Sequence, residues 1–217
     1  MYNSNNNIRV DAIKNGQWEY WSILPAVFSV AHLIQYVVNR EYSQTLWYCL
    51  CFSFIFSYAI IKKNSLWIQF GIITSINAFV FWTVHLLTAH VTSVTSILLH
   101  VCNLIIALSL STTFRTSMRA VFYSYAGAVM MQIVSLVIRS GVLSVGFDFG
   151  SPVNLIHDTR YPIFSSNQFV FIYYLGVHLR YWLVLGVSLV LSRAIYNRRQ
   201  KKILNSINVK ESKKIMA

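Results

Sequence analysis

Residues 81–103 read FWTVHLLTAHVTSVTSILLHVCN, and this stretch decides the fold. Two apolar runs flank a short Thr-Ala-His segment at residues 88–90, so the chain is expected to cross a bilayer, turn and cross back. Similar apolar runs of about 17–25 residues recur along the chain, and each is long enough to span the ~30 Å of hydrocarbon in a bilayer. The stretch therefore predicts one hairpin of a polytopic membrane protein.

The composition of all 217 residues supports an all-α membrane domain. Hydrophobic residues make up 56% of the chain and charged residues only 11%, a balance that is atypical of soluble domains. The polar breaks between the apolar runs predict a bundle of six transmembrane helices. Their expected ranges are 21–38, 45–61, 66–87, 91–110, 120–138 and 169–195.

Positive charges in the connecting segments predict that both termini are cytoplasmic. With the N-terminus inside, the inner segments carry most of the Lys and Arg residues and the outer segments carry few. The inner ones are Arg9, Lys14, Lys62, Lys63, Arg115, Arg119 and the C-terminal cluster, and the outer ones are Arg40, Arg139 and Arg160. The predicted organisation is a polar N-terminal tail at 1–20, a transmembrane domain at 21–195 with a long outer loop at 139–168, and a basic cytoplasmic tail at 196–217.

The formal net charge of +12 comes largely from the C-terminus. Eight of the 18 Lys and Arg residues lie in the last 25 positions, just after the final apolar run. Basic clusters beside a membrane are attracted to anionic cytoplasmic lipids by about 1 kcal/mol per charge. Membrane lipids are therefore the predicted partners and nucleic acid is not. The predicted localisation is an integral membrane protein, with the endoplasmic reticulum and the plasma membrane both left open.

Polar side chains inside predicted spans are costly in lipid and are expected to face the bundle interior. A rise of ~1.5 Å per residue from the predicted outer end of each helix places four of them at a depth of roughly 14–15 Å. These four are Ser29, Asn77, His100 and His178. By the same count His85 and His90 lie near the outer surface. His100 is thus the only histidine of the opening stretch expected near the bilayer midplane.

This polar layer predicts acid–base chemistry on a hydroxyl group. The predicted spans contain no Asp or Glu and no His pair with metal-ligand spacing, so neither a metal nor another cofactor is expected. A Ser hydroxyl becomes nucleophilic when a neutral imidazole can accept its proton. We therefore expect Ser29 or another hydroxyl as nucleophile, His100 as general base and Asn77 as oxyanion donor, acting on a lipid. The expected substrate-binding residues are His178, Arg180, His32 and Gln35.

The order of these features resembles the androgen-induced membrane hydrolases. The similar segments are AVFSVAHLIQYVV at 26–38, VFW at 80–82, SILLHVC at 96–102 and TRYPIF at 159–164. The resemblance implies a six-helix hydrolase of fatty-acid esters of hydroxy fatty acids, with a Thr nucleophile on an early helix and a catalytic His on a later one. Ser29 falls close to that nucleophile position, and His100 falls at the position of the His. The chain departs from the family because it lacks the Asn and Gly beside the His and the acidic residue shortly after that helix.

Two other functions fit the same polar layer. A transporter of small molecules or ions would use the layer to line a path, with Arg180 selecting anions. A non-catalytic membrane subunit would use it only to hold helices together through hydrogen bonds. The lipid-ester hydrolase is the function that we expect, with these two as alternatives.

Overall fold

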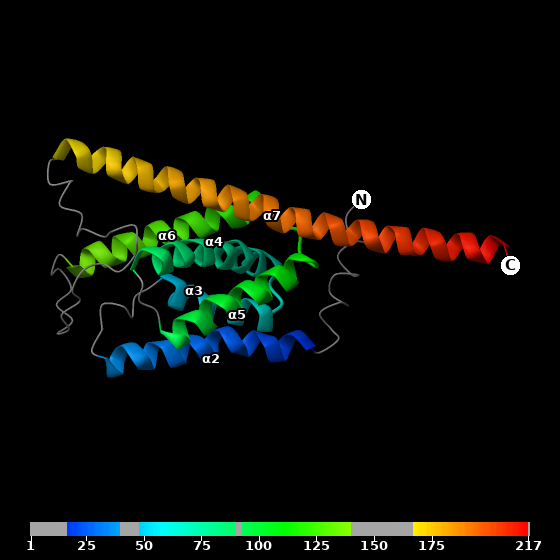
Figure 1. Cartoon of the computed structure of the whole chain (residues 1–217), viewed down its shortest axis with the longest axis horizontal. Coiled ribbons are helices and arrows are strands. Elements are labelled where there is room, and N and C mark those ends of the chain that lie inside the picture. Colours follow the sequence, from blue (N-terminus) through cyan, green and yellow to red (C-terminus); the bar gives the residue numbers. More distant parts are fainter. Residues whose placement is uncertain (1–16, 40–47, 90–92, 140–166, 217) are drawn as a thin grey trace.

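The computed structural model describes residues 17–39, 48–89, 93–139 and 167–216, and every element in these ranges is an α-helix (Figure 1). Four stretches are long and apolar enough to cross a membrane: Trp21–Val38, Ser65–Val84, Val94–Ser111 and His178–Ile207. The all-α prediction is confirmed, and these stretches support a multi-pass membrane protein, whereas six spans and cytoplasmic termini stay predictions. The helices are α2 (Gln17–Val38), α3 (Tyr48–Ile61), α4 (Ser65–Ala89), α5 (Val94–Ser111), α6 (Met118–Arg139) and α7 (Asn167–Met216).

Each predicted span corresponds to one helix, but some helix ends differ from the prediction. The largest difference is in α7, which continues to Met216 instead of ending near residue 195. The segment after residue 195 contains no Gly or Pro to stop the helix, and basic side chains are favourable near a helix C-terminus. The predicted basic tail is therefore helical through Met216. The predicted N-terminal tail and outer loop fall almost entirely outside the described residues.

Helices α2, α3, α4 and α5 form a ring in which each packs against two neighbours. α2 contacts α3 and α5, and α4 contacts the same two helices. The later turns of α2 and α4 meet the first turn of α5, through His32 and Thr95 and through Trp82 and Ser96, so both helices run antiparallel to α5. α6 and α7 pack against α4 on the side away from α2 (Figure 1).

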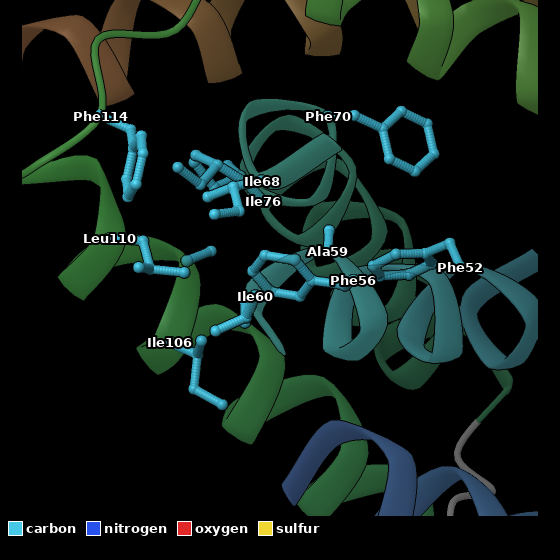
Figure 2. Close-up of a cluster of buried hydrophobic side chains, with 12 residues drawn as sticks. Phe52, Phe56, Ala59, Ile60, Ile68, Phe70, Ile76, Ile106, Leu110 and Phe114 are labelled. Atoms are coloured by element: carbon cyan, nitrogen blue, oxygen red, sulfur yellow. The ribbon is translucent and has the colours of Figure 1, made fainter. Parts of the chain in front are cut away.

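α4 lies between two buried apolar clusters. The ring core joins α3, α4 and α5 around Phe56, Ile76 and Leu110 (Figure 2). The second core joins Ile73 of α4 to Leu185 of α7 and to residues of α6. Because α4 is buried from both sides, it has no single apolar stripe of the kind that marks a surface helix.

α3 and α4 lie in close contact at Gly71. A Cβ atom built on Gly71 would lie 1.9 Å from Cδ2 of the Phe56 ring. Phe56 is fully buried in the ring core, so its ring has no space into which it can move. The absence of a side chain at residue 71 is therefore a condition for this helix packing.

A short turn with two caps joins α3 to α4. Lys63 has a φ of 54°, in the left-handed region. Its N–H donates to the carbonyl of Ile60 at 3.0 Å, and the N–H of Asn64 donates to that of Ala59 at 3.0 Å, which are the two bonds of a Schellman motif. The side-chain oxygen of Asn64 then accepts the N–H of Trp67 at 3.2 Å. Asn64 thus completes the C-terminal cap of α3 with its N–H and forms the N-cap of α4 with its side chain.

Two substitutions in this turn are expected to change the free energy of unfolding in opposite directions. Lys63→Gly is expected to raise the free energy of unfolding by about 1 kcal/mol, because glycine adopts a positive φ without the clash of a Cβ atom. Asn64→Ala is expected to lower it by about 1 kcal/mol, because the cap of α4 is lost. Unfolding in mixed detergent micelles measures both changes, and a less stable Lys63→Gly variant would contradict this description of the turn.

Two arginines hold α7 against the connection between α5 and α6. Arg193 Nε donates to the carbonyl oxygen of Thr116 at 3.0 Å, and Arg199 donates to the hydroxyl of Thr112. The hydroxyl oxygens of Thr116 and Ser192 are also 2.6 Å apart. Beyond these contacts α7 projects past the other helices (Figure 1). The contact of this basic segment with an anionic leaflet stays a prediction.

Candidate functional site

A polar contact joins the later turns of α2 to the first turn of α5. His32 Nδ1 lies 2.7 Å from Thr95 Oγ1, and the Thr95 hydroxyl is also hydrogen-bonded to Gln35 Oε1. The hydroxyl oxygen of Ser93 lies 3.1 Å from Thr95 Oγ1. Two residues expected to bind substrate, His32 and Gln35, therefore share one hydroxyl partner on another helix.

The sequence of α2 directs His32 towards that partner. Ser22, Pro25, Ser29 and His32 recur every three or four residues and are all buried, so they form one stripe against α3 and α5. His32 exposes only 2% of its surface, and the centroid of its ring lies 4.3 Å from that of Tyr36. The imidazole of His32 therefore packs against the Tyr36 ring on one side and contacts the Thr95 hydroxyl on the other.

Thr95 stands at the amino end of α5. Ser93 is the N-cap of this helix, with φ −95° and ψ 154°, and its hydroxyl accepts the N–H of Ser96 at 3.1 Å. The first N–H groups of a helix have no acceptor within the helix, and the helix dipole makes this end partially positive. Thr95 is only partly buried. Its hydroxyl thus combines a buried imidazole on one side with a positively polarised backbone on the other.

His100 has a different environment from the one expected. Its ring stacks on Trp82 with centroids 5.2 Å apart and planes inclined by 19°. Trp82 Nε1 in turn donates to the hydroxyl of Ser96 at 3.1 Å. Ser96 and His100 are four residues apart, so they lie on the same face of α5 towards α4. His100 therefore belongs to the contact between α4 and α5.

The structure does not bring the three expected catalytic residues together. Ser29 is fully buried, and its hydroxyl has no hydrogen-bond partner within the described residues, so the expected bond to His100 is not formed. Asn77 follows Ile73 by four residues and shares its face, which packs against α6 and α7. Asn77 therefore lies on the opposite side of α4 from the ring that contains Ser29. The catalytic roles of all three stay predictions.

The two remaining candidates also lie apart from Thr95. His178 of α7 has its Nδ1 atom 3.1 Å from the hydroxyl oxygen of Tyr125 on α6. Arg180 comes two positions later, on a different face of α7, and is exposed. Both belong to the α6–α7 side of α4. Their substrate-binding roles are untested predictions.

The residue that sequence reasoning missed is Thr95. Its signal was the run Ser93-Val94-Thr95-Ser96 immediately before an apolar helix, because hydroxyl residues at such a position are typical N-caps. A second signal was the spacing of His32 and Gln35, three residues apart and thus on one helix face. Neither signal alone shows that the two segments meet.

Within the described ranges, no group of three His, Cys, Asp or Glu side chains is placed to hold a metal ion. A scan against protein-family models, a search of curated proteins and a search of solved structures found no match to this chain. The resemblance to the androgen-induced membrane hydrolases therefore stays a prediction. The chemistry of His32, Gln35 and Thr95 is therefore the basis for the function proposed below.

Proposed function

We propose that the protein is an intramembrane hydrolase of lipid esters, with Thr95 as nucleophile and His32 as general base. The observation that supports this is the 2.7 Å separation between His32 Nδ1 and Thr95 Oγ1. An imidazole within hydrogen-bond distance of a hydroxyl is the minimum arrangement for activating that hydroxyl. Ser29 and His100, the pair expected from the sequence, lack such a contact because the Ser29 hydroxyl is unbonded.

The reaction follows from these groups in two steps. Thr95 Oγ1 attacks the ester carbonyl carbon while its proton passes to His32 Nδ1, and the alcohol then leaves with that proton. Water then attacks the acyl-threonine carbonyl carbon while His32 takes its proton, and His32 returns that proton to Thr95 Oγ1 as the fatty acid leaves. The N–H of Ser96 is already bonded to Ser93, so the N–H groups of Val94 and Thr95 would stabilise the oxyanion in both steps.

Gln35 determines which way the Thr95 proton points. When its Oε1 atom faces Thr95, the threonine donates to the amide and the His32 Nδ1–H donates to the threonine. When the amide is turned over, its NH₂ group donates to Thr95, and the threonine donates to His32. The second arrangement is the reactive one, and the two differ only by exchange of the amide oxygen and nitrogen.

The surroundings of this pair suit a lipid substrate. Leu98 follows Thr95 by three residues on the same side of α5 and is a large apolar side chain that remains exposed, while Val30 and Ile34 are exposed on the outer face of α2. In a membrane such side chains face acyl chains, so a lipid can approach the partly buried Thr95 without entering water. The chain order of nucleophile and base is the reverse of that implied by the family resemblance, but this chemistry depends on geometry and not on chain order.

Covalent labelling tests the proposal. A fluorophosphonate probe with a long alkyl chain is expected to modify Thr95 in the reconstituted protein, as mapped by peptide mass spectrometry. Thr95→Val should abolish the label. Thr83→Val is the matched control, because Thr83 is also a partly buried membrane threonine but bonds to the carbonyl of Phe79 in its own helix at 2.8 Å. Labelling of Ser29 in place of Thr95 would restore the assignment expected from the sequence and refute this one.

A further inference from the structure

Three buried polar atoms on α2, α3 and α5 have no hydrogen-bond partner within the described residues. They are Ser29 Oγ of α2, Ser57 Oγ of α3 and Asn103 Oδ1 of α5. These side chains expose 0%, 3% and 2% of their surfaces, so neither lipid nor bulk solvent reaches them directly. Buried polar groups in proteins are almost always hydrogen-bonded, to the protein or to ordered water.

By residue count the three atoms lie at a similar level of the ring. Ser29 is nine positions before the end of α2, and Ser57 and Asn103 are nine positions after the starts of α3 and α5. With a rise of ~1.5 Å per residue, each lies about 14 Å from the same end of the ring. α2 packs against both α3 and α5. Asn103 Nδ2 also donates to Ser53 Oγ at 2.7 Å, and Ser53 lies one helical turn from Ser57.

The three polar atoms lie between the Thr95 site, towards the start of α5, and the apolar side chains of the ring core. Ser29 is three residues from His32 on the buried stripe of α2, and His32 contacts Thr95. On the far side the ring core fills the interface with Ile60, Ile106, Leu110 and Phe114 (Figure 2). Buried polar side chains thus extend inward from the start of α5 along His32 and Ser29 of α2, and apolar side chains of the ring core lie beyond them.

We infer that these polar side chains line a route for ordered water molecules that enters beside Thr95 and ends at Ser29, Ser57 and Asn103. Water fits because the three groups are neutral, and each hydroxyl or amide can exchange hydrogen bonds with it. Membrane-embedded polar groups that lack protein partners are satisfied in the same way when they line a wet cavity. The route is a dead end, so it supplies water without connecting the two sides of the membrane.

This inference deepens the proposed function, because the acyl-threonine step consumes one water molecule and the route delivers water to His32. Its physical basis is nevertheless independent of catalysis. The unpaired atoms need water whether or not Thr95 is a nucleophile, so the test measures hydration and not activity.

Radiolytic hydroxyl labelling of the unmodified protein in lipid nanodiscs tests for this water. Leu99 lies four residues after Thr95 and four before Asn103, and Leu185 lies in the second core; both are 0% exposed. Oxidation of Leu99 is expected to be at least tenfold faster than that of Leu185, because radicals form from water held beside it. Equal rates for the two leucines would overturn the inference.

Thiol accessibility provides the second test. In a background with Cys49, Cys51 and Cys102 replaced by Ala, Ser29→Cys and Ser57→Cys are expected to react with aminoethyl methanethiosulfonate at least tenfold faster than Ser188→Cys. Ser188 is equally buried, but its hydroxyl bonds to the carbonyl of Val184 at 2.8 Å. Slow reaction at all three positions overturns the route. Fast reaction at Ser29 without fluorophosphonate labelling of Thr95 retains the route and rejects the hydrolase.

Discussion

Gly71→Ala is expected to lower the free energy of unfolding by about 3 kcal/mol. The added Cβ atom would lie 1.9 Å from the Phe56 ring, far inside van der Waals contact. Phe56 is enclosed by the ring core, so relief requires α3 and α4 to separate. The higher helix propensity of alanine offsets only about 1 kcal/mol of this loss. Unfolding of the purified protein in mixed micelles measures the loss.

Gly186→Ala is the matched control for this effect. Gly186 also lies within a helix, α7, but a Cβ atom built there meets nothing within 4 Å. The same substitution should therefore leave stability unchanged or raise it by up to about 1 kcal/mol. Phe56→Leu combined with Gly71→Ala should lose less than the sum of the two single variants, because the smaller side chain leaves space for the methyl group. Equal losses at Gly71 and Gly186 would contradict the close approach of α3 and α4.

Replacement of His32 by Ala is expected to lower kcat/KM for a lipid ester by about 10²–10⁴-fold, which is the usual contribution of a general base. The imidazole is the only proton acceptor of its kind bonded to Thr95 in the described residues. Hydrolysis by the protein reconstituted in vesicles, with long-chain esters of hydroxy fatty acids as substrates, measures the change. Thr83→Val is the control, because the Thr83 hydroxyl bonds to a carbonyl of its own helix, that of Phe79.

His100→Ala separates the present assignment from the one expected from the sequence. His100 stacks on Trp82 and is not the base that contacts Thr95. Its loss should weaken the packing of α4 on α5 and lower kcat/KM by less than tenfold. A variant pattern in which His100→Ala is inactive and His32→Ala retains activity would make the His32–Thr95 contact purely structural.

The helices were predictable because long apolar runs and the polar breaks between them depend on local sequence. The extent of α7 was harder to predict, since the charges that suggested a separate tail are compatible with a continuing helix. For the candidate site, counting residues gave the depth of Ser29 and Asn77, but depth does not determine direction. The two residues lie on opposite sides of α4, and only the packing of helices distant in sequence reveals it. The contact of His32 with Thr95 joins residues 63 positions apart and depends on the same packing.

The position of α4 between two cores also has a consequence for biosynthesis. A nascent chain that has released α2 to α5 into the membrane already possesses every helix of the ring. Until α6 and α7 follow, however, Thr74 and Asn77 of α4 face lipid, although Thr74 is later 2.8 Å from Ser124 of α6. Polar side chains are costly in lipid, so a chain truncated after α5 should be less stable in a membrane than the full protein. The packing of α6 and α7 on α4 is thus the step that shields these polar groups from lipid.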